Sequence, residues 1–416
     1  MHVRPHPPRR AKNLMLLTLG LGLIALVTCF LSNPPVVSSQ RRVIENPKAL
    51  DRFFKALDDM KSGRRIEPVR IIHYGDSHTA ADILTAEIRH RFQNEFGDGG
   101  PGYIVARNPM TTPRRSLTSG ATSAWEIDGI GKSSGNDGYY GLAGLSLTTN
   151  KPNERLWIET KCNTFEVYYM RWPGGGTIDI TVDGASVLDE PLSLNSDIPG
   201  PDYFTHNMVA ETNHRVEVRT LTPGRTRILG IVAENVGPHS GVSYDVLGIN
   251  GARINRLLSW NLNVLVDNVI QRNPNLIIFA YGTNEVTDDW TIESYSRTVT
   301  EALQRFRRAV PKASIIVFGP PDRADNQVAR RRMPQLIEAQ RRAAKAAGAA
   351  FWSSYDAMGG AGSMDNWVKQ GMGQGDYVHL TGQGYVKLAT MFHEDLMKAY
   401  ADDSEAKPRS RSAAKP

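Results

Sequence analysis

Cysteine is nearly absent from this chain. Two cysteines, Cys29 and Cys162, occur among 416 residues. If the chain is exported, as the apolar segment described below indicates, its cysteines would normally form disulfide pairs. Cys29 lies inside an apolar segment, so no intrachain disulfide is expected, and stability must come from core packing.

Surplus positive charge is missing from the middle of the chain. The net charge is +6, but the excess lies at the two ends. The basic residues there are Arg4, Arg9, Arg10 and Lys12 near the start and Lys407, Arg409, Arg411 and Lys415 near the end. The central region is formally neutral, so no nucleic-acid partner is expected.

One long apolar run is present, at residues 14–31, and the basic residues Arg9, Arg10 and Lys12 precede it. A run of about 18 apolar residues reaches the lower limit for crossing a bilayer. It exceeds the usual signal-peptide core of about 7–15 residues. We expect residues 1–32 to anchor the chain in the inner membrane, with a cleaved signal peptide as the alternative. The basic head should stay in the cytoplasm, so the rest is expected to be periplasmic or otherwise extracytoplasmic.

Apolar segments of two kinds alternate in the regions 50–112 and 241–400. Strand-like runs occupy 69–74, 246–250, 276–281 and 315–318, and helical periodicity marks 50–61, 79–96, 254–270, 292–309, 330–347 and 384–397. This alternation predicts an α/β domain with a parallel sheet and helices on both faces.

The segment 113–240 has a different character. Short alternating runs separated by Gly and Pro turns predict an inserted β-sandwich or jelly roll. Its aromatic residues either form the core of the insert, which we favour, or make a platform for sugars; they are Trp125, Trp157, Tyr168, Tyr169 and Trp172. A linker is expected at 33–49 and a disordered basic tail at 401–416.

Three short segments, far apart in the sequence, each carry candidate catalytic side chains. They are Gly75-Asp76-Ser77-His78, Gly282-Thr283-Asn284-Glu285 and Asp376-Tyr377-Val378-His379. Ser77 follows a strand and precedes a helix, which places a nucleophile at the carboxyl edge of a sheet. His379 is the expected general base, and Asp376 the group that orients it. Each residue also has an ordinary structural interpretation, such as a helix cap for Ser77.

Three groups are candidates to stabilise an oxyanion. The backbone N–H of Ser77 lies at a predicted helix start, and Gly251 ends another strand, where glycine permits close approach to a ligand. Asn284 ends a third strand and can donate from its amide. A turn or a helix cap is the alternative role for Asn284 and Gly251.

His73, Asp76 and His78 suggest a rival, a metal site as in a metallophosphoesterase. Such a site needs further His and Asp ligands, and the Gly282–Glu285 segment has no histidine. We therefore expect no metal and no cofactor. His73 is expected to be a strand residue, and His78 to line the entrance of the site.

The matching segments resemble the SGNH (GDSL-type) hydrolase family. Ser77, Gly251, Asn284 and His379 match its four named residues, with Asp376 before the histidine. Gly-Asp-Ser-His followed by Gly-Asp-Gly-Gly-Pro-Gly-Tyr resembles bacterial peptidoglycan O-acetylesterases, whose insert is similar to carbohydrate-binding modules. The resemblance implies a flavodoxin-like three-layer sandwich with an inserted jelly-roll-like β domain.

The function that this resemblance implies is a carboxylic ester hydrolase. A monomeric serine esterase is expected to remove O-acetyl groups from a cell-envelope glycan, peptidoglycan above all, through an acetyl-enzyme. An O-acetyltransferase acting on an envelope polysaccharide is the alternative, since it uses the same residues. A non-catalytic glycan-binding protein is the alternative from another class.

Overall fold

The computed structural model describes residues 43–108, 117–129 and 137–406. The predicted membrane segment and Cys29 lie outside the described residues, as does the end of the predicted tail. Within the described ranges, no helix is long and apolar enough to cross a membrane. The last residues of the predicted linker are folded, because Glu45 forms a β-bridge with Phe351 and Ile44 is buried.

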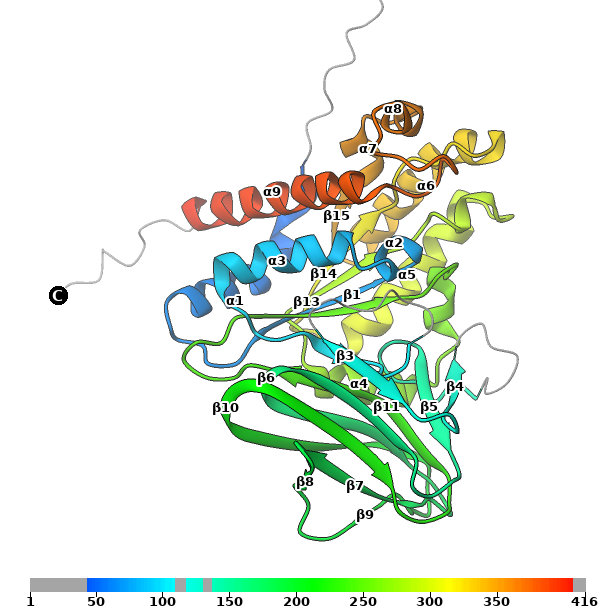
Figure 1. Cartoon of the computed structure of the whole chain (residues 1–416). Coiled ribbons are helices and arrows are strands. Elements are labelled where there is room, and N and C mark those ends of the chain that lie inside the picture. Colours follow the sequence, from blue (N-terminus) through cyan, green and yellow to red (C-terminus); the bar gives the residue numbers. More distant parts are fainter. Residues whose placement is uncertain (1–42, 109–116, 130–136, 407–416) are drawn as a thin grey trace, which may run out of the picture. The chain divides into compact units, whose positions relative to one another are not determined.

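A five-stranded parallel sheet forms the centre of the α/β half, in the order β12-β1-β13-β14-β15 (Figure 1). Its strands are β1 (Val69–Gly75), β12 (Val242–Gly248), β13 (Leu276–Ala280), β14 (Ser314–Gly319) and β15 (Ala350–Ser353). Numbered within this sheet, the order is 2-1-3-4-5, which is the flavodoxin-like order. The chain order reverses at β1, so the ligand-binding edge is expected at the carboxyl ends of β1 and its neighbours.

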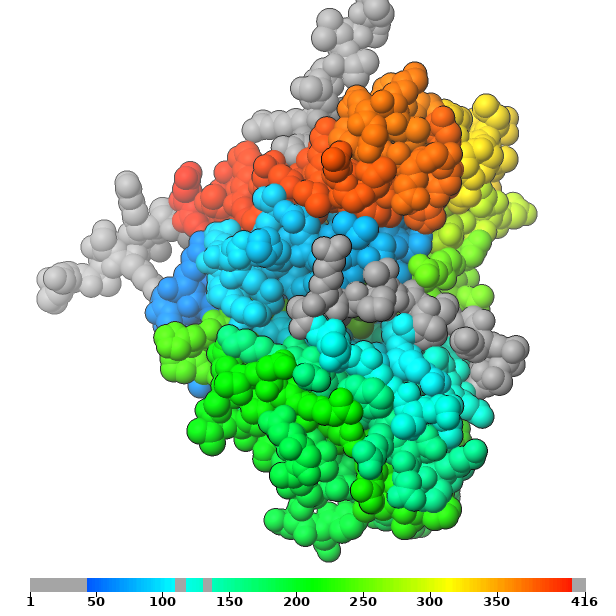
Figure 2. Space-filling view, in the orientation of Figure 1, coloured from blue at the N-terminus to red at the C-terminus, as the bar shows by residue number. Residues whose placement is uncertain are grey.

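Helices cover both faces of this sheet. They are η1 (Pro47–Leu50), α1 (Asp51–Lys61), α2 (Ser77–Ala80), α3 (Leu84–Phe96), η2 (Ile254–Leu258), α4 (Leu262–Arg272), η3 (Glu285–Thr287), α5 (Ile292–Ala309), α6 (Gln327–Ala346), α7 (Ser354–Met358), α8 (Ser363–Lys369) and α9 (Gly382–Ala406). Successive strand residues point to opposite faces, so Ile277 packs in the core with α4, α5 and α6, and Ile278 packs with α1, α3 and α9. Helices α3 and α9 lie side by side although α3 precedes the insert and α9 is the last helix described (Figures 1 and 2). The predicted three-layer fold is confirmed.

Three predicted helices have other bounds in the structure, and the one expected at 254–270 is divided into η2 and α4. The helix expected at 79–96 is broken. Asp82 adopts a left-handed backbone angle (φ 47°), which separates the single turn of α2 from the start of α3. Ile83 is consequently 39% exposed instead of packing with the core face. At the other end, α9 continues to Ala406, beyond the residue where the tail was expected to start.

The insert is an antiparallel β domain. Its strands are β2 (Gly102–Ile104), β3 (Thr118–Ala121), β4 (Glu126–Gly129), β5 (Leu145–Thr149), β6 (Arg155–Arg171), β7 (Thr177–Val182), β8 (Ala185–Ser186), β9 (Leu192–Ser193), β10 (Gly200–Thr220) and β11 (Thr226–Glu234). The first half of β6 pairs with β3 and the second half with β11, while β10 runs beside both halves. The long strands β6 and β10 thus join all ten into one continuous sheet, not the two separate sheets of a simple sandwich.

The aromatic residues of the insert belong mainly to its core. Trp125, Tyr168, Tyr169 and Trp172 are all buried. Trp157 is half-buried, and the guanidinium of Arg215 lies 4.6 Å from its ring centroid. The core interpretation is therefore confirmed for four of the five residues. Cys162 is buried in the same core as a free thiol, and burial raises its pKa to about 12.

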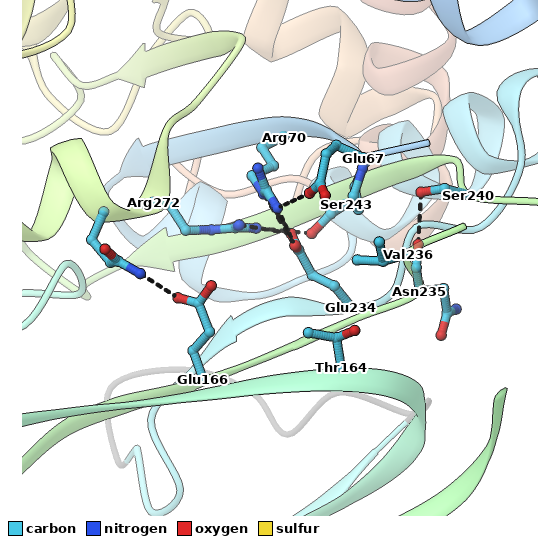
Figure 3. Close-up of polar contacts among 12 residues, drawn as sticks. Glu67, Arg70, Thr164, Glu166, Glu234, Asn235, Val236, Ser240, Ser243 and Arg272 are labelled. Atoms are coloured by element: carbon cyan, nitrogen blue, oxygen red, sulfur yellow. Dashed lines mark hydrogen bonds and ion pairs between the residues drawn. The ribbon is translucent and has the colours of Figure 1, made fainter. Parts of the chain in front are cut away.

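A buried ionic network joins the insert to the parallel sheet (Figure 3). Glu234, at the end of β11, accepts hydrogen bonds from Arg272 Nη1 (2.6 Å) and Arg70 Nη2 (2.8 Å). Arg272 also donates to both carboxylate oxygens of Asp245 (2.7 and 2.9 Å) and to Ser243 (2.9 Å). Burial alone would raise the pKa of Glu234, but the two guanidinium groups lower it to about 2. The apolar core also runs on from the insert to one face of the sheet, so the insert is an integral part of the fold.

Candidate active site

Ser77 lies directly after β1, at the carboxyl edge of the parallel sheet. Backbone packing there is tight: a Cβ on Gly75 would come 2.0 Å from the Thr79 hydroxyl oxygen, and one on Gly248 would come 2.2 Å from the Ala80 nitrogen. The helix that begins at Ser77, α2, is a single turn of four residues. The expected helix start is therefore present, but its dipole is that of one turn only.

The three predicted triad residues meet in the structure. Ser77 Oγ lies 2.9 Å from His379 Nε2, and His379 Nδ1 lies 2.7 Å from Asp376 Oδ2. The other oxygen, Asp376 Oδ1, accepts the backbone N–H groups of Val378 and His379, each at 2.9 Å. Burial raises the pKa of Asp376, but the hydrogen bonds from His379 and Val378 outweigh it and hold the pKa below its usual value. The carboxylate thus stays ionised and fixes the ring.

A strained backbone shapes the loop that presents His379. Tyr377, between the two residues, has a left-handed φ of 58°, which residues other than glycine rarely adopt. Its carbonyl accepts the N–H of Ala324 at 2.9 Å, and Gln374 N donates to the His379 carbonyl at 2.8 Å. These bonds hold the loop in the conformation that directs both side chains toward Ser77.

The predicted oxyanion groups lie on loops that follow neighbouring strands. Gly251 follows β12 with φ 73°, and a Cβ there would meet no atom within 4 Å. Asn284 follows β13, and its Nδ2 donates to the carbonyl of Ala252 at 3.0 Å. One N–H of the amide is therefore used to hold the Gly251 loop, which leaves the second N–H for a ligand.

His78 does not line the entrance; that prediction was wrong. The side chain is buried, its Nδ1 lies 2.9 Å from the Tyr385 hydroxyl, and its ring centroid lies 5.3 Å from that of His379. Burial, and the nearby His379, lower the pKa of His78 to about 3. A neutral ring therefore packs against the ring of His379. Tyr385, the partner of His78, was missed because its spacing from His78 carries no local signal.

His73 is a strand residue, as expected. It is buried in β1, and its Nδ1 lies 2.7 Å from the Tyr244 hydroxyl. Both histidines of the rival metal site are thus bonded to tyrosine hydroxyls. In the described ranges, no group of three or more His, Cys, Asp or Glu residues could hold a metal ion.

Replacing His73 with asparagine should make the protein less sensitive to acid. Burial lowers the pKa of His73 to about 3, so between pH 6.5 and 3 the native state binds fewer protons than the unfolded chain. Stability from this group is therefore lost as the pH falls through that window, by about 1 kcal/mol for each pH unit. Between pH 7 and pH 5, urea unfolding should show the variant losing about 2 kcal/mol less of its free energy of unfolding than the wild type loses. Equal losses in the two proteins would contradict the assignment.

Two acids near Ser77, Asp76 and Glu285, are buried, and only Asp76 had a candidate role in the sequence, as a ligand of the rival metal site. Burial raises the pKa of Asp76 to about 6, against the hydrogen bond from the His78 backbone N–H, and burial raises the pKa of Glu285 to about 7. Glu285 lies beside Asn284 in a segment that we had singled out. The position of Glu285 shortly after an apolar strand was the sequence feature that indicated its burial.

Replacing Asn284 with alanine should lower the turnover of an acetyl ester by about 10²–10³ with little change in KM, since oxyanion donors act in the transition state. Steady-state kinetics on a soluble acetyl ester measure this. Asn94 is exposed in α3, and its alanine variant serves as the control. If folded Asn284→Ala loses less than threefold in turnover, the Asn284 amide is not an oxyanion donor.

Comparison with known proteins agrees with this geometry. Residues 216–387 match the model of the GDSL-like lipase/acylhydrolase family. That range contains Gly251, Asn284, Asp376 and His379, and it begins after Ser77. No curated protein matches the chain.

Among solved structures, a peptidoglycan O-acetylesterase is similar with a TM-score of 0.73 and 24% identity, covering 86% of this chain and 99% of its own. A family two carbohydrate esterase from Cellvibrio japonicus matches with a TM-score of 0.29 and 13% identity, covering 68% of this chain and 99% of its own. The first likeness extends over nearly the whole fold, insert included. Residues 216–387 therefore match a GDSL-like lipase/acylhydrolase domain, and the first structural likeness agrees with the expected fold.

Proposed function

We propose that this protein is a serine esterase that removes O-acetyl groups from a cell-envelope glycan, with peptidoglycan as the substrate. The observation that carries the proposal is the chain of contacts from Ser77 Oγ to His379 Nε2 and from His379 Nδ1 to Asp376. A hydroxyl becomes a nucleophile when a base accepts its proton and a third group orients that base.

The proposed reaction has two halves. His379 takes the proton of Ser77 as Oγ attacks the acetyl carbonyl, while the N–H groups of Ser77 and Gly251 and the Asn284 amide stabilise the oxyanion. The sugar oxygen leaves with the proton from His379, which gives an acetyl-enzyme. Water, deprotonated by His379, then releases acetate and restores the Ser77 hydroxyl.

The choice of glycan has separate support. The solved structure that is similar over 86% of this chain is a peptidoglycan O-acetylesterase. The apolar run at 14–31 and its basic head favour a location outside the cytoplasm, anchored at the inner membrane, where this polymer is found. We propose this location together with the substrate.

Acetate release from O-acetylated peptidoglycan tests the proposal, with acetylated xylan as the comparison. We expect faster release from peptidoglycan, and no release from peptidoglycan that has been de-acetylated with base. Preference for xylan would overturn the envelope substrate while leaving the esterase chemistry intact. Transfer of acetyl to an added acceptor glycan, with little free acetate, would identify a transferase instead.

A further inference from the structure

Glu285 is a buried acid next to the proposed oxyanion site. It is 4% exposed and, among the described residues, forms no ion pair. Burial raises the pKa of its carboxyl to about 7, and the nearby Asp76 acts in the same direction. A carboxyl in such surroundings destabilises a fold unless its hydrogen bonds offset the cost of burial.

Both oxygens of Glu285 accept backbone N–H groups, and the two donors come from different loops. Oε1 accepts from Ile254 at 2.8 Å, and Oε2 accepts from Gly282 at 3.0 Å. Ile254 lies three residues after Gly251, and Gly282 lies two residues before Asn284. One carboxylate therefore connects the loop after β12 with the loop after β13.

We propose that Glu285 is a positioning residue that holds the Gly251 and Asn284 loops in the single arrangement that oxyanion stabilisation requires. This inference rests on the proposed esterase function. A donor contributes to catalysis only if it is already directed at the place where negative charge develops. Gly251 and Asn284 lie on separate loops, so their mutual placement needs a group that contacts both loops.

The other contacts between these loops are either more exposed to solvent or consist of a single neutral hydrogen bond. Arg253 pairs with Asp288 at 2.5 Å, but each side chain is 36% exposed. Asn284 reaches Ala252 through one neutral hydrogen bond of 3.0 Å. Glu285 is the buried member of this set, and its two oxygens accept one backbone N–H from each loop.

The backbone of Glu285 is fixed as well. Its carbonyl accepts the indole N–H of Trp290 at 2.5 Å, and the Arg332 guanidinium lies 4.2 Å from the Trp290 ring centroid. A side chain that bridges two loops can only position them if its own main chain is held. Trp290 and Arg332 supply that support.

Replacing Glu285 with glutamine keeps the size and shape of the side chain but changes the hydrogen bonds that connect the two loops. Its carbonyl accepts one N–H, but its amide presents a donor to the other N–H, so one of the two connections is lost. We expect Glu285→Gln to lower kcat for a soluble acetyl ester by about 10–100-fold with KM within twofold, because misplacement of about 1 Å is enough for such a loss. Glu301→Gln, an exposed glutamate of α5, is the matched control and should retain full activity.

Hydrogen exchange on the full chain gives a readout that does not depend on activity. We expect at least one of the two amides, Ile254 or Gly282, to exchange at least tenfold faster in Glu285→Gln than in the wild type. Unchanged protection at both amides, or kcat within twofold of wild type in the folded variant, overturns the positioning role. A wild-type protein that releases no acetate refutes the esterase proposal instead, and the exchange at the two amides still decides the role of Glu285.

Discussion

Replacing Ser77 with alanine should lower the turnover of an acetyl ester by about 10⁶. The Oγ atom is the proposed nucleophile and lies 2.9 Å from His379 Nε2, so its removal ends acetyl-enzyme formation. The side chain is half-buried, and its loss creates no large cavity, so the variant should unfold like the wild type. Acetate release measures the turnover, and mass spectrometry of quenched protein detects the acetyl group on the wild type alone.

Three further variants sharpen this test. His379→Ala should cost about as much as Ser77→Ala, and the double variant should cost little more, because the residues act as one unit. Ser404 is exposed in α9, and its alanine variant should be fully active. More than 1% of wild-type turnover in Ser77→Ala would exclude Ser77 as the nucleophile.

Replacing Glu234 with alanine should lower the free energy of unfolding by about 3–5 kcal/mol. The carboxylate is buried between Arg70 and Arg272, and both guanidinium groups lose their shared partner when it is removed (Figure 3). An uncompensated buried charge costs more than the ion pair itself contributes. Urea unfolding, followed by both circular dichroism and fluorescence, measures the change.

The control for this variant is Glu301→Ala, whose partner Arg305 lies 3.5 Å away with Glu301 57% exposed. Such surface pairs are worth about 1 kcal/mol or less. The shared core predicts that insert and parallel sheet unfold together in both proteins. A loss below 1 kcal/mol, or two separate transitions, would contradict an integral insert.

The parallel sheet was predictable because its signals are local. Strands such as β13 are buried on both faces and appear as unbroken apolar runs. Helix α5 was predicted with its observed bounds, since Thr291 and Ser294 form a capping box at its start. β15 was missed because Ala350–Ser353 is only four residues long and carries no alternation.

The meeting of Ser77, Asp376 and His379 could be predicted from the segments that carry them. The burial of His78 could not, since it depends on Tyr385, which is more than 300 residues away. Glu234 and Arg272 were missed for the same reason, because an ion pair between distant segments leaves no local pattern. The sequence also gave no sign that Glu285 spans two loops, since its donors Ile254 and Gly282 are identified only by the packing.

The position of the insert has a consequence for how the protein folds. Both sheet neighbours of β1, namely β12 and β13, come after the insert in the chain. During synthesis β1 therefore has no strand to pair with until the whole β domain has been made. Such non-local pairing slows folding and leaves a bare apolar strand that can aggregate. Rapid completion of the insert thus shortens the time in which the nascent chain is vulnerable.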